Sequence, residues 1–172
     1  MFVEDFALIT LDIPYSNPNV HPLCLTLDPN MPSIKNKLIK VSGWGYINET
    51  MKNANKFPDI LQHATLKIKD PKNCFRKYFS TDFPSNWSEQ KTKGFCAKGD
   101  NEQRTCQGDS GGAAIWEDSK DQNRKYLIGI ISLDDGECGE TTPTTPTIYA
   151  AISKKVADWL HKKINPDLEC RL

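Results

Sequence analysis

Short apolar runs separated by turn-forming residues recur along the whole chain and predict a structure built mainly of β-strands. Within each run the side chains are either continuously apolar or alternate between apolar and polar, as in strands with one or two buried faces. Glycine, proline, asparagine and serine gather between the runs, where turns are needed. The expected strands cover residues 6–11, 37–44, 61–68, 95–97, 112–116, 126–132 and 147–152. Many short strands of this kind are typical of an antiparallel barrel.

One amphipathic helix is expected near the C-terminal end. Ser153 can cap its first turn, and the pair Asn165-Pro166 ends it. Its apolar face is formed by Val156, Trp159, Leu160 and Ile164. The segments between elements are polar: 14–36 is expected to be a connector, 80–93 and 141–147 are expected to be loops, and 71–78 is expected to form one or two helical turns.

Composition sets limits on size and on partners. The 172 residues suffice for about one domain, and 38% of them are hydrophobic, which is enough for a buried core. Lys and Arg total 22, and Asp and Glu also total 22, so the formal net charge is zero. A neutral chain gives no electrostatic reason to expect nucleic acid or an anionic membrane as a partner. No run approaches the ~18 apolar residues of a membrane span.

Six cysteines and two glycosylation sequons indicate a secreted, extracellular protein. No two of the cysteines form a CxxC pair, so disulfides are favoured over a zinc site. The sequons place Asn48 and Asn86 in polar stretches, where N-glycans are expected. Residues 1–5 include no basic segment leading into an apolar run, so they do not form an export signal. The chain is therefore expected to be incomplete at its start.

The segment most informative for chemistry is 106–112, Cys-Gln-Gly-Asp-Ser-Gly-Gly. Its glycines allow a sharp turn and let a substrate approach the main chain. The amide N–H groups of Gly108 and Ser110 can then point together at an oxygen that becomes negatively charged, beside the Ser110 hydroxyl. Loss of one such donor typically costs about 2.7–4 kcal/mol of transition-state stabilisation. An ordinary turn without function would use the same residue types.

The complete heptad resembles the active-serine segment of the chymotrypsin-like serine proteases. Further segments resemble that family in the same order: 5–11, 20–25, 41–45, 129–132 and 146–149. The resemblance implies a mostly β, trypsin-like double-barrel fold in truncated form, with the last strand of a first barrel, a complete six-stranded antiparallel second barrel and a C-terminal helix. The implied divisions are a first-barrel remnant at 1–13, a linker at 14–36, the second barrel at 37–152 and the helix at 153–164, within a partial peptidase domain of 1–165 followed by a tail at 166–172.

The resemblance also implies roles for four residues. Ser110 is the expected nucleophile, and Gly108 and Ser110 together supply the oxyanion hole. Asp5 matches the acid that orients the catalytic histidine, and the alternative is a solvated acid beside Glu4. Asp109 matches the carboxylate that pairs with a newly cut N-terminal amine when the family's zymogens are activated. The implied activity is endopeptidase, with protein or peptide substrates, protease inhibitors as a further class of partner, and neither cofactor nor metal.

The histidine of the triad has no counterpart in the chain. In this family it precedes the aspartate, but none of the four residues before Asp5 is histidine. His21, His63 and His161 match surface or structural positions instead. The chain is therefore expected to lack useful peptidase activity alone and to have a first barrel as its missing partner. A non-catalytic homologue that acts as a secreted binding module is the alternative.

Four residues are expected around the substrate. Ser132 ends the strand that resembles the family's substrate-pairing strand, and Arg104 lies six residues before Ser110, at the floor of the specificity pocket. Trypsin-like members have aspartate there, so cleavage after Lys or Arg is not expected. Asp134 and Thr147 stand at wall positions that are commonly glycine. Two alternatives stay open: Arg104 receives an acidic side chain, or it pairs with Asp134 and closes the pocket.

Six cysteines permit 15 pairings, and the resemblance selects two of them. Cys74 with Cys96 resembles the bridge of one surface loop, and Cys106 with Cys138 resembles the bridge that braces the specificity pocket. Cys24 and Cys170 stay unassigned. They can pair with each other, with another molecule, or, for Cys24, with a cysteine upstream of this sequence.

Overall fold

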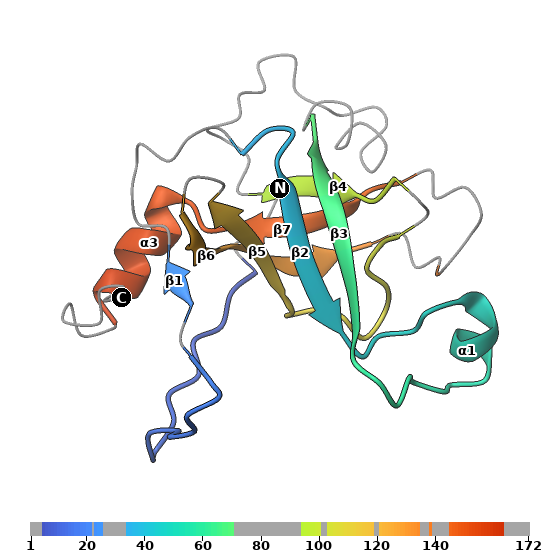
Figure 1. Cartoon of the computed structure of the whole chain (residues 1–172), viewed down its shortest axis with the longest axis horizontal. Coiled ribbons are helices and arrows are strands. Elements are labelled where there is room, and N and C mark those ends of the chain that lie inside the picture. Colours follow the sequence, from blue (N-terminus) through green and yellow to red (C-terminus); the bar gives the residue numbers. More distant parts are fainter. Residues whose placement is uncertain are drawn as a thin grey trace.

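The computed structural model describes residues 5–21, 23–25, 34–70, 94–100, 103–118, 121–134, 138 and 145–163. Its strands are β1 (Cys24–Leu25), β2 (Leu38–Gly43), β3 (Gln62–Lys69), β4 (Gly94–Lys98), β5 (Ala113–Asp118), β6 (Asp121–Leu133) and β7 (Thr147–Ala151). Its described helices are α1 (Glu49–Asn53) and α3 (Lys154–His161) (Figure 1). Six of the strands fall where the alternation of apolar and polar residues predicts them.

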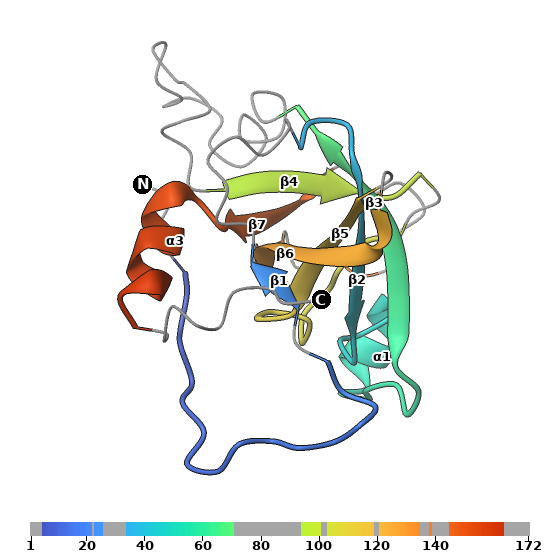
Figure 2. The same cartoon turned by 60° about the vertical axis from the view of Figure 1, so that its left-hand side comes forward.

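Strands β2 to β7 close into one antiparallel barrel (Figures 1 and 2). Around the barrel the order is β6, β5, β2, β3, β4, β7, and β7 pairs back with β6. The longest regular ladder joins β2 to β3, from Leu38 opposite Lys67 to Gly43 opposite Gln62. Strand β1 adds to the outside of β6 in parallel, with Cys24 opposite Tyr126. The predicted six-stranded second barrel is therefore confirmed.

The barrel interior is filled by the apolar side chains that alternate along its strands. In β2 the buried residues are Ile39 and Val41. Leu38, the first residue of the strand, points to the other face and stays exposed. Further core residues are Leu66, Ile68, Phe95, Ala97, Ala114, Trp116, Ile128, Ile131 and Tyr149. The rings of Phe95 and Tyr149 stack across β4 and β7 with their centroids 5.0 Å apart. This packing fixes which side chains of each strand point into the barrel and which point outward.

Helix α3 forms where it is expected and by the expected cap. The Ser153 side chain accepts a hydrogen bond from the Val156 amide, which satisfies one of the free N–H groups of the first turn. Val156, Ala157 and Leu160 are buried. Trp159, expected on the same face, is 37% exposed. Ile164 and the Asn165-Pro166 stop lie outside the described residues.

The N-terminal segment does not form the strand expected at 6–11. Residues 5–21 have no strand or helix, and in Figure 2 the segment runs as a blue loop below the barrel. The physical reason is that a strand is stabilised by hydrogen bonds to a neighbouring strand, and none of the described strands pairs with residues 6–11. Its apolar side chains are consequently open to solvent: Ile9 is 81% exposed and Ile13 is 79% exposed.

Two elements were not expected. The two-residue strand β1 lies inside the predicted connector 14–36, and helix α1 lies in the polar segment that carries the first sequon. The helical turns predicted at 71–78 and the loop at 80–93 lie outside the described residues, as does most of the loop at 141–147.

The exposed apolar segment gives a prediction about solution behaviour. Recombinant protein of this length is expected to self-associate at micromolar concentration, because Ile9 and Ile13 present unpartnered apolar surface. The double variant Ile9→Lys, Ile13→Lys is expected to be monomeric by size-exclusion chromatography with light scattering. A monodisperse, cooperatively melting parent chain would contradict this. The matched control Lys35→Arg, Lys37→Arg leaves the apolar surface unchanged.

Candidate active site

The turn at 106–112 is held by hydrogen bonds within itself and to strand β6. The Asp109 amide donates to the Cys106 carbonyl at 3.0 Å, and the Gly112 amide donates to the Asp109 carbonyl at 2.9 Å. The Gly111 amide donates across to the Ile131 carbonyl in β6 at 2.9 Å. Gly108 has a φ of 100°, in the left-handed region that favours glycine. A side chain there would also lie 3.0 Å from the Phe57 ring.

Two amides of this turn take no part in the described hydrogen bonds that hold it. Within the described ranges, the N–H groups of Gly108 and Ser110 donate to no other part of the protein, whereas those of Asp109, Gly111 and Gly112 all do. Ser110 is exposed. The turn therefore presents two available N–H donors on either side of one residue, next to an accessible hydroxyl. Such a pair can bind an oxygen atom that carries negative charge.

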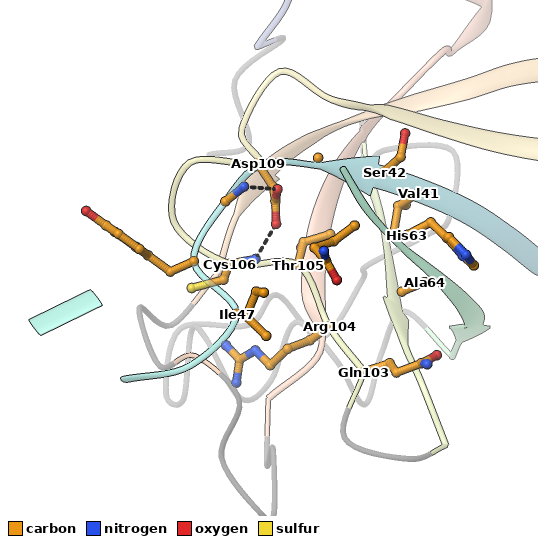
Figure 3. A pocket seen from close by; sticks show the side chains of 14 residues that line it. Val41, Ser42, Ile47, His63, Ala64, Gln103, Arg104, Thr105, Cys106 and Asp109 are labelled. Carbon is orange, nitrogen blue, oxygen red and sulfur yellow. Dashed lines mark hydrogen bonds between the residues drawn. The ribbon is translucent and has the colours of Figure 1, made fainter. Parts of the chain in front are cut away.

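Asp109 turns inward from the same turn (Figure 3). One carboxylate oxygen, Oδ1, accepts from the Gly45 amide at 2.8 Å, and Oδ2 accepts from the Cys106 amide at 2.9 Å. Glycine at 45 is required by this approach, because a Cβ atom there would lie 2.6 Å from the Asp109 Cγ atom. The segment that follows β2 and the turn at 106–112 are thus joined through one half-buried carboxylate.

A cavity of about 300 Å³ opens beside Asp109. Its wall is partly polar, with Ser42, His63 and Gln103, and partly apolar, with Ile47. Arg104 also lines it, and in Figure 3 the guanidinium group lies near Ile47, away from Asp109. The residue predicted at the floor of the specificity pocket therefore contributes to this cavity.

Asp5 lies against the barrel. The Ser132 hydroxyl donates to the Asp5 carboxylate, Oδ2, at 2.8 Å, although the two residues are 127 positions apart. Ser132 directly follows Ile131, whose carbonyl accepts from the Gly111 amide of the turn at 106–112. Two consecutive residues of β6 thus hold Asp5 and the turn with Ser110, which brings these parts of the predicted site together.

The predicted wall residue Thr147 is fully buried at the start of β7. Its Oγ1 atom lies 2.8 Å from that of Thr105, which is 3% exposed. Tyr149 lies deeper in the barrel. Burial raises the pKa of its phenol above the ordinary value, and the neighbouring hydroxyls of Thr105 and Thr147 offset only part of that rise. The other wall residue, Asp134, directly follows β6 and is half-buried.

One expected disulfide is present, between Cys106 and Cys138, with their Cα atoms 5.5 Å apart. Cys96 is also disulfide-bonded. Its partner is not among the residues whose side chains are described, so the pairing with Cys74 stays a prediction. Cys74 and Cys170 lie outside the described residues, as does the side chain of Cys24.

Helix α1 braces the disulfide, a role that the sequence pattern missed. The Glu49 carboxylate accepts from the Cys138 amide at 2.7 Å, and Met51 packs against the two half-cystines with Tyr46. The start of α1 has a recognisable signal, since Asn48 is a favoured N-cap residue and its side chain accepts from the Met51 amide at 2.9 Å. The exposed Asn48 is also the first sequon. Asn86, the second, lies outside the described residues.

The described helices include none with the length and apolar character that a bilayer crossing requires.

Comparison with known proteins agrees with this geometry. The family model described as Trypsin matches residues 2–160. Transmembrane protease serine 11B of Homo sapiens is 32% identical over 93% of this chain, and the thrombin-like enzyme acutin of Deinagkistrodon acutus is 31% identical over 97%. The chain spans only 35% and 63% of the length of these two relatives.

A solved structure has the same fold. Neuropsin, a serine protease expressed in the limbic system of mouse brain, superimposes with a TM-score of 0.61 at 28% identity. The match covers 84% of this chain and 54% of the neuropsin chain. Since the family model extends over nearly the whole sequence and the barrel is shared, the chain belongs to the trypsin family of serine proteases.

Proposed function

We propose that the protein is a serine endopeptidase and that this chain supplies its nucleophile, oxyanion hole and triad aspartate. The observation that carries the proposal is the attachment of both parts to consecutive residues of β6: the turn with Ser110 to Ile131, and Asp5 to Ser132. The available amides of Gly108 and Ser110 support the same assignment. The hydrogen bond from Ser132 to Asp5 favours the triad role over the alternative that Asp5 is a solvated surface acid.

The proposed reaction is acyl transfer. The Ser110 oxygen attacks the peptide carbonyl carbon while its proton passes to a histidine base, and the carbonyl oxygen takes the negative charge between the amides of Gly108 and Ser110. The protonated histidine then gives its proton to the departing amine as the C–N bond breaks. Water, activated by the same base, hydrolyses the ester and restores the Ser110 hydroxyl. Asp5 orients the histidine and stabilises its charged form.

We infer that the base comes from outside the residues of this chain. His21 is exposed in the N-terminal segment, and His63 lines the Asp109 cavity from β3. His161 ends α3, and we assign it no role. We therefore propose that a first barrel supplies the histidine and that the chain alone lacks useful activity. Loss of this histidine typically lowers kcat by about 10⁶-fold.

The cavity beside Asp109 suits a role in activation. A half-buried carboxylate facing a cavity of about 300 Å³ can pair with an ammonium group that enters it. We propose that the newly cut N-terminal amine of the activated protein takes this place. The charge pair would then hold the turn that carries Ser110.

Further aspects of the proposal concern partners and location. Protein or peptide substrates and protease inhibitors are the proposed partners, and the protein is proposed to be secreted, with N-glycans at Asn48 and Asn86. At Asn48 the side-chain oxygen caps α1. Because a glycan is attached through the side-chain nitrogen, the cap and the glycan are compatible.

Labelling with a fluorophosphonate probe tests the proposed function. The chain alone is expected to remain unlabelled. Fused behind a histidine-bearing first barrel from a trypsin-family protease, it is expected to react at Ser110, and the Ser110→Ala variant of the fusion should not react. Failure of a folded fusion to react would favour the non-catalytic binding module. Rapid labelling of the chain alone would contradict the assignment of the base to a separate barrel.

A further inference from the structure

The main-chain amide of Tyr46 holds the peptide unit that contains the N–H group of Gly108. It donates a hydrogen bond to the Gln107 carbonyl at 3.0 Å. A trans peptide unit is planar, so its C=O and N–H groups point in opposite directions. The peptide bonds of the described residues are all trans. The hydrogen bond from Tyr46 therefore directs the N–H group of Gly108 away from Tyr46.

Glycine at position 108 gives this restraint its importance. Glycine adopts φ values of either sign at little cost, so the peptide between Gln107 and Gly108 is free to rotate unless its surroundings hold it. Two neighbours approach Gly108 closely. The Gly45 Cα atom and the Phe57 Cε1 atom each lie 3.0 Å from the position that a Cβ atom of Gly108 would occupy. The ring of Phe57 thus packs directly on this glycine.

The side chain of Tyr46 is held by two partners. Its ring stacks on Phe57, with the ring centroids 4.4 Å apart and the planes 12° from parallel. Its hydroxyl donates to the Asn55 side-chain oxygen, Oδ1, at 2.5 Å. Tyr46 is 9% exposed. A buried side chain that is held at both its ring and its hydroxyl keeps the Tyr46 amide in place on the Gln107 carbonyl.

Both partners of Tyr46 come from the end of helix α1. The Asn55 amide donates to the Lys52 carbonyl of the helix at 3.0 Å. Asn55 has a φ of 49°, in the left-handed region that asparagine enters more readily than most residues. The chain turns at this residue, and Phe57 follows two positions later. Helix α1 thus places a ring and a hydrogen-bond acceptor against Tyr46.

We propose, on the basis of the proposed function, that Tyr46 and Phe57 are positioning residues for the acyl transfer. Through the Gln107 carbonyl and the ring contact with Gly108, they keep the Gly108 N–H group directed at the oxygen that becomes negatively charged. Neither residue takes part in a bond that forms or breaks. They act through one donor, so replacing them leaves the hydroxyl and the amide of Ser110 in place.

Residual dipolar couplings test the inference in the full chain without a base, because they report the direction of each N–H bond. The isotopically labelled chain carries the two solubilising lysine substitutions in its N-terminal segment. Phe57→Ala is expected to reduce the Gly108 couplings toward zero in two alignment media, since the N–H bond then samples several directions. Tyr46→Leu, which removes the stacked ring and the hydroxyl, is expected to do the same. The amides of Gly111 and Gly112 should keep their parent couplings, which shows that the turn remains folded.

Two control variants separate the ring contact from a general loss of apolar surface. Phe57→Tyr keeps a ring that can stack and should retain the parent couplings of Gly108. Ile60→Ala removes an apolar side chain of the same segment that is 76% exposed, and it should also leave these couplings unchanged. Parent couplings in Phe57→Ala, or an equal change in Ile60→Ala, would overturn the inference.

Fluorophosphonate labelling of the fusion with a histidine-bearing first barrel measures the consequence for chemistry. Complete loss of one oxyanion donor typically lowers kcat about 10²–10³-fold. Phe57→Ala misdirects the Gly108 donor for part of the time, so it is expected to lower the labelling rate at saturating probe by at least about tenfold. The probe concentration that gives half of this rate should not change. A purely structural effect would instead lower the fraction of protein that is labelled, at an unchanged rate.

The two measurements distinguish failure of this inference from failure of the proposed function. If the parent fusion is labelled and Phe57→Ala leaves the saturating rate unchanged, the inference is wrong and the proposed function stands, whatever the couplings show. If a folded parent fusion is not labelled, the proposed function fails. The contact between Phe57 and Tyr46 would then orient an amide without catalytic use, and the positioning role would be withdrawn with it.

Discussion

Replacing Asp5 by asparagine is expected to lower kcat about 10⁴-fold once the chain is joined to a histidine-bearing first barrel. The carboxylate is held by the Ser132 hydroxyl at 2.8 Å, so an amide of the same shape can occupy its place. What the amide lacks is the negative charge that selects the productive histidine tautomer and stabilises the imidazolium. The loss should therefore appear in kcat for a peptide substrate, with little change in KM.

The matched control is the neighbouring acid. Glu4→Gln removes one negative charge from the same segment, so it reproduces any general electrostatic effect of Asp5→Asn. It is expected to change kcat less than twofold. Equal effects of the two substitutions would show that Asp5 is an ordinary surface acid, and the assignment of the triad aspartate would be withdrawn. Ser132→Ala, which removes the hydroxyl that holds Asp5, is expected to give an intermediate loss.

Replacing Gly45 by alanine is expected to destabilise the barrel by about 3 kcal/mol. The new methyl group would lie 2.6 Å from the Asp109 Cγ and Oδ1 atoms, so the carboxylate has to move. It would then lose its hydrogen bonds from the Gly45 and Cys106 amides. Hydrogen bonds to a charged group contribute about 1.5–3 kcal/mol each, and a partly buried carboxylate without them is costly. Urea denaturation in the solubilised Ile9→Lys, Ile13→Lys background measures the loss.

Gly111, in the turn at 106–112 that Asp109 joins to Gly45, serves as the control for backbone strain alone. Gly111 has a φ of 84°, yet a Cβ atom there would meet nothing within 4 Å. Gly111→Ala is therefore expected to cost about 1 kcal/mol, from conformation only. If Gly45→Ala were no more destabilising than Gly111→Ala, the contact between Gly45 and Asp109 would not be the reason for glycine at that position.

Regular strands were predictable because their cause is local. In β2, Ile39 and Val41 alternate with polar or exposed residues, and the structure buries these two. The segment 6–11 has the same apolar character but no strand, because pairing depends on a neighbour that a pattern of single residues does not reveal. Apolar side chains indicate that burial of a segment would be favourable. Only the fold indicates whether a neighbouring strand is present to pair with it.

Parts of the candidate site depended on contacts between distant segments. Helix α1 is only five residues long, and it is held by Glu49 on the Cys138 amide, 89 positions away. A helix this short is not stable by propensity alone, so its own sequence gave a weak signal. Counting six residues back from Ser110 predicts Arg104 at the floor of the specificity pocket, and that role stays a prediction. The direction of its side chain, toward the Asp109 cavity, follows from the barrel and not from the spacing.

Strand β1 and the Asp5–Ser132 contact together make the N-terminal segment a closed loop whose two ends are both fastened to β6. The entropy of closing such a loop rises only logarithmically with its length, by about 0.6 kcal/mol for each doubling. Residues between the two attachments can therefore be added or removed at a small cost in free energy, while Asp5 keeps its hydrogen bond to Ser132. The stretch around residues 12–19 is for this reason a suitable place to insert an affinity tag or a spectroscopic reporter.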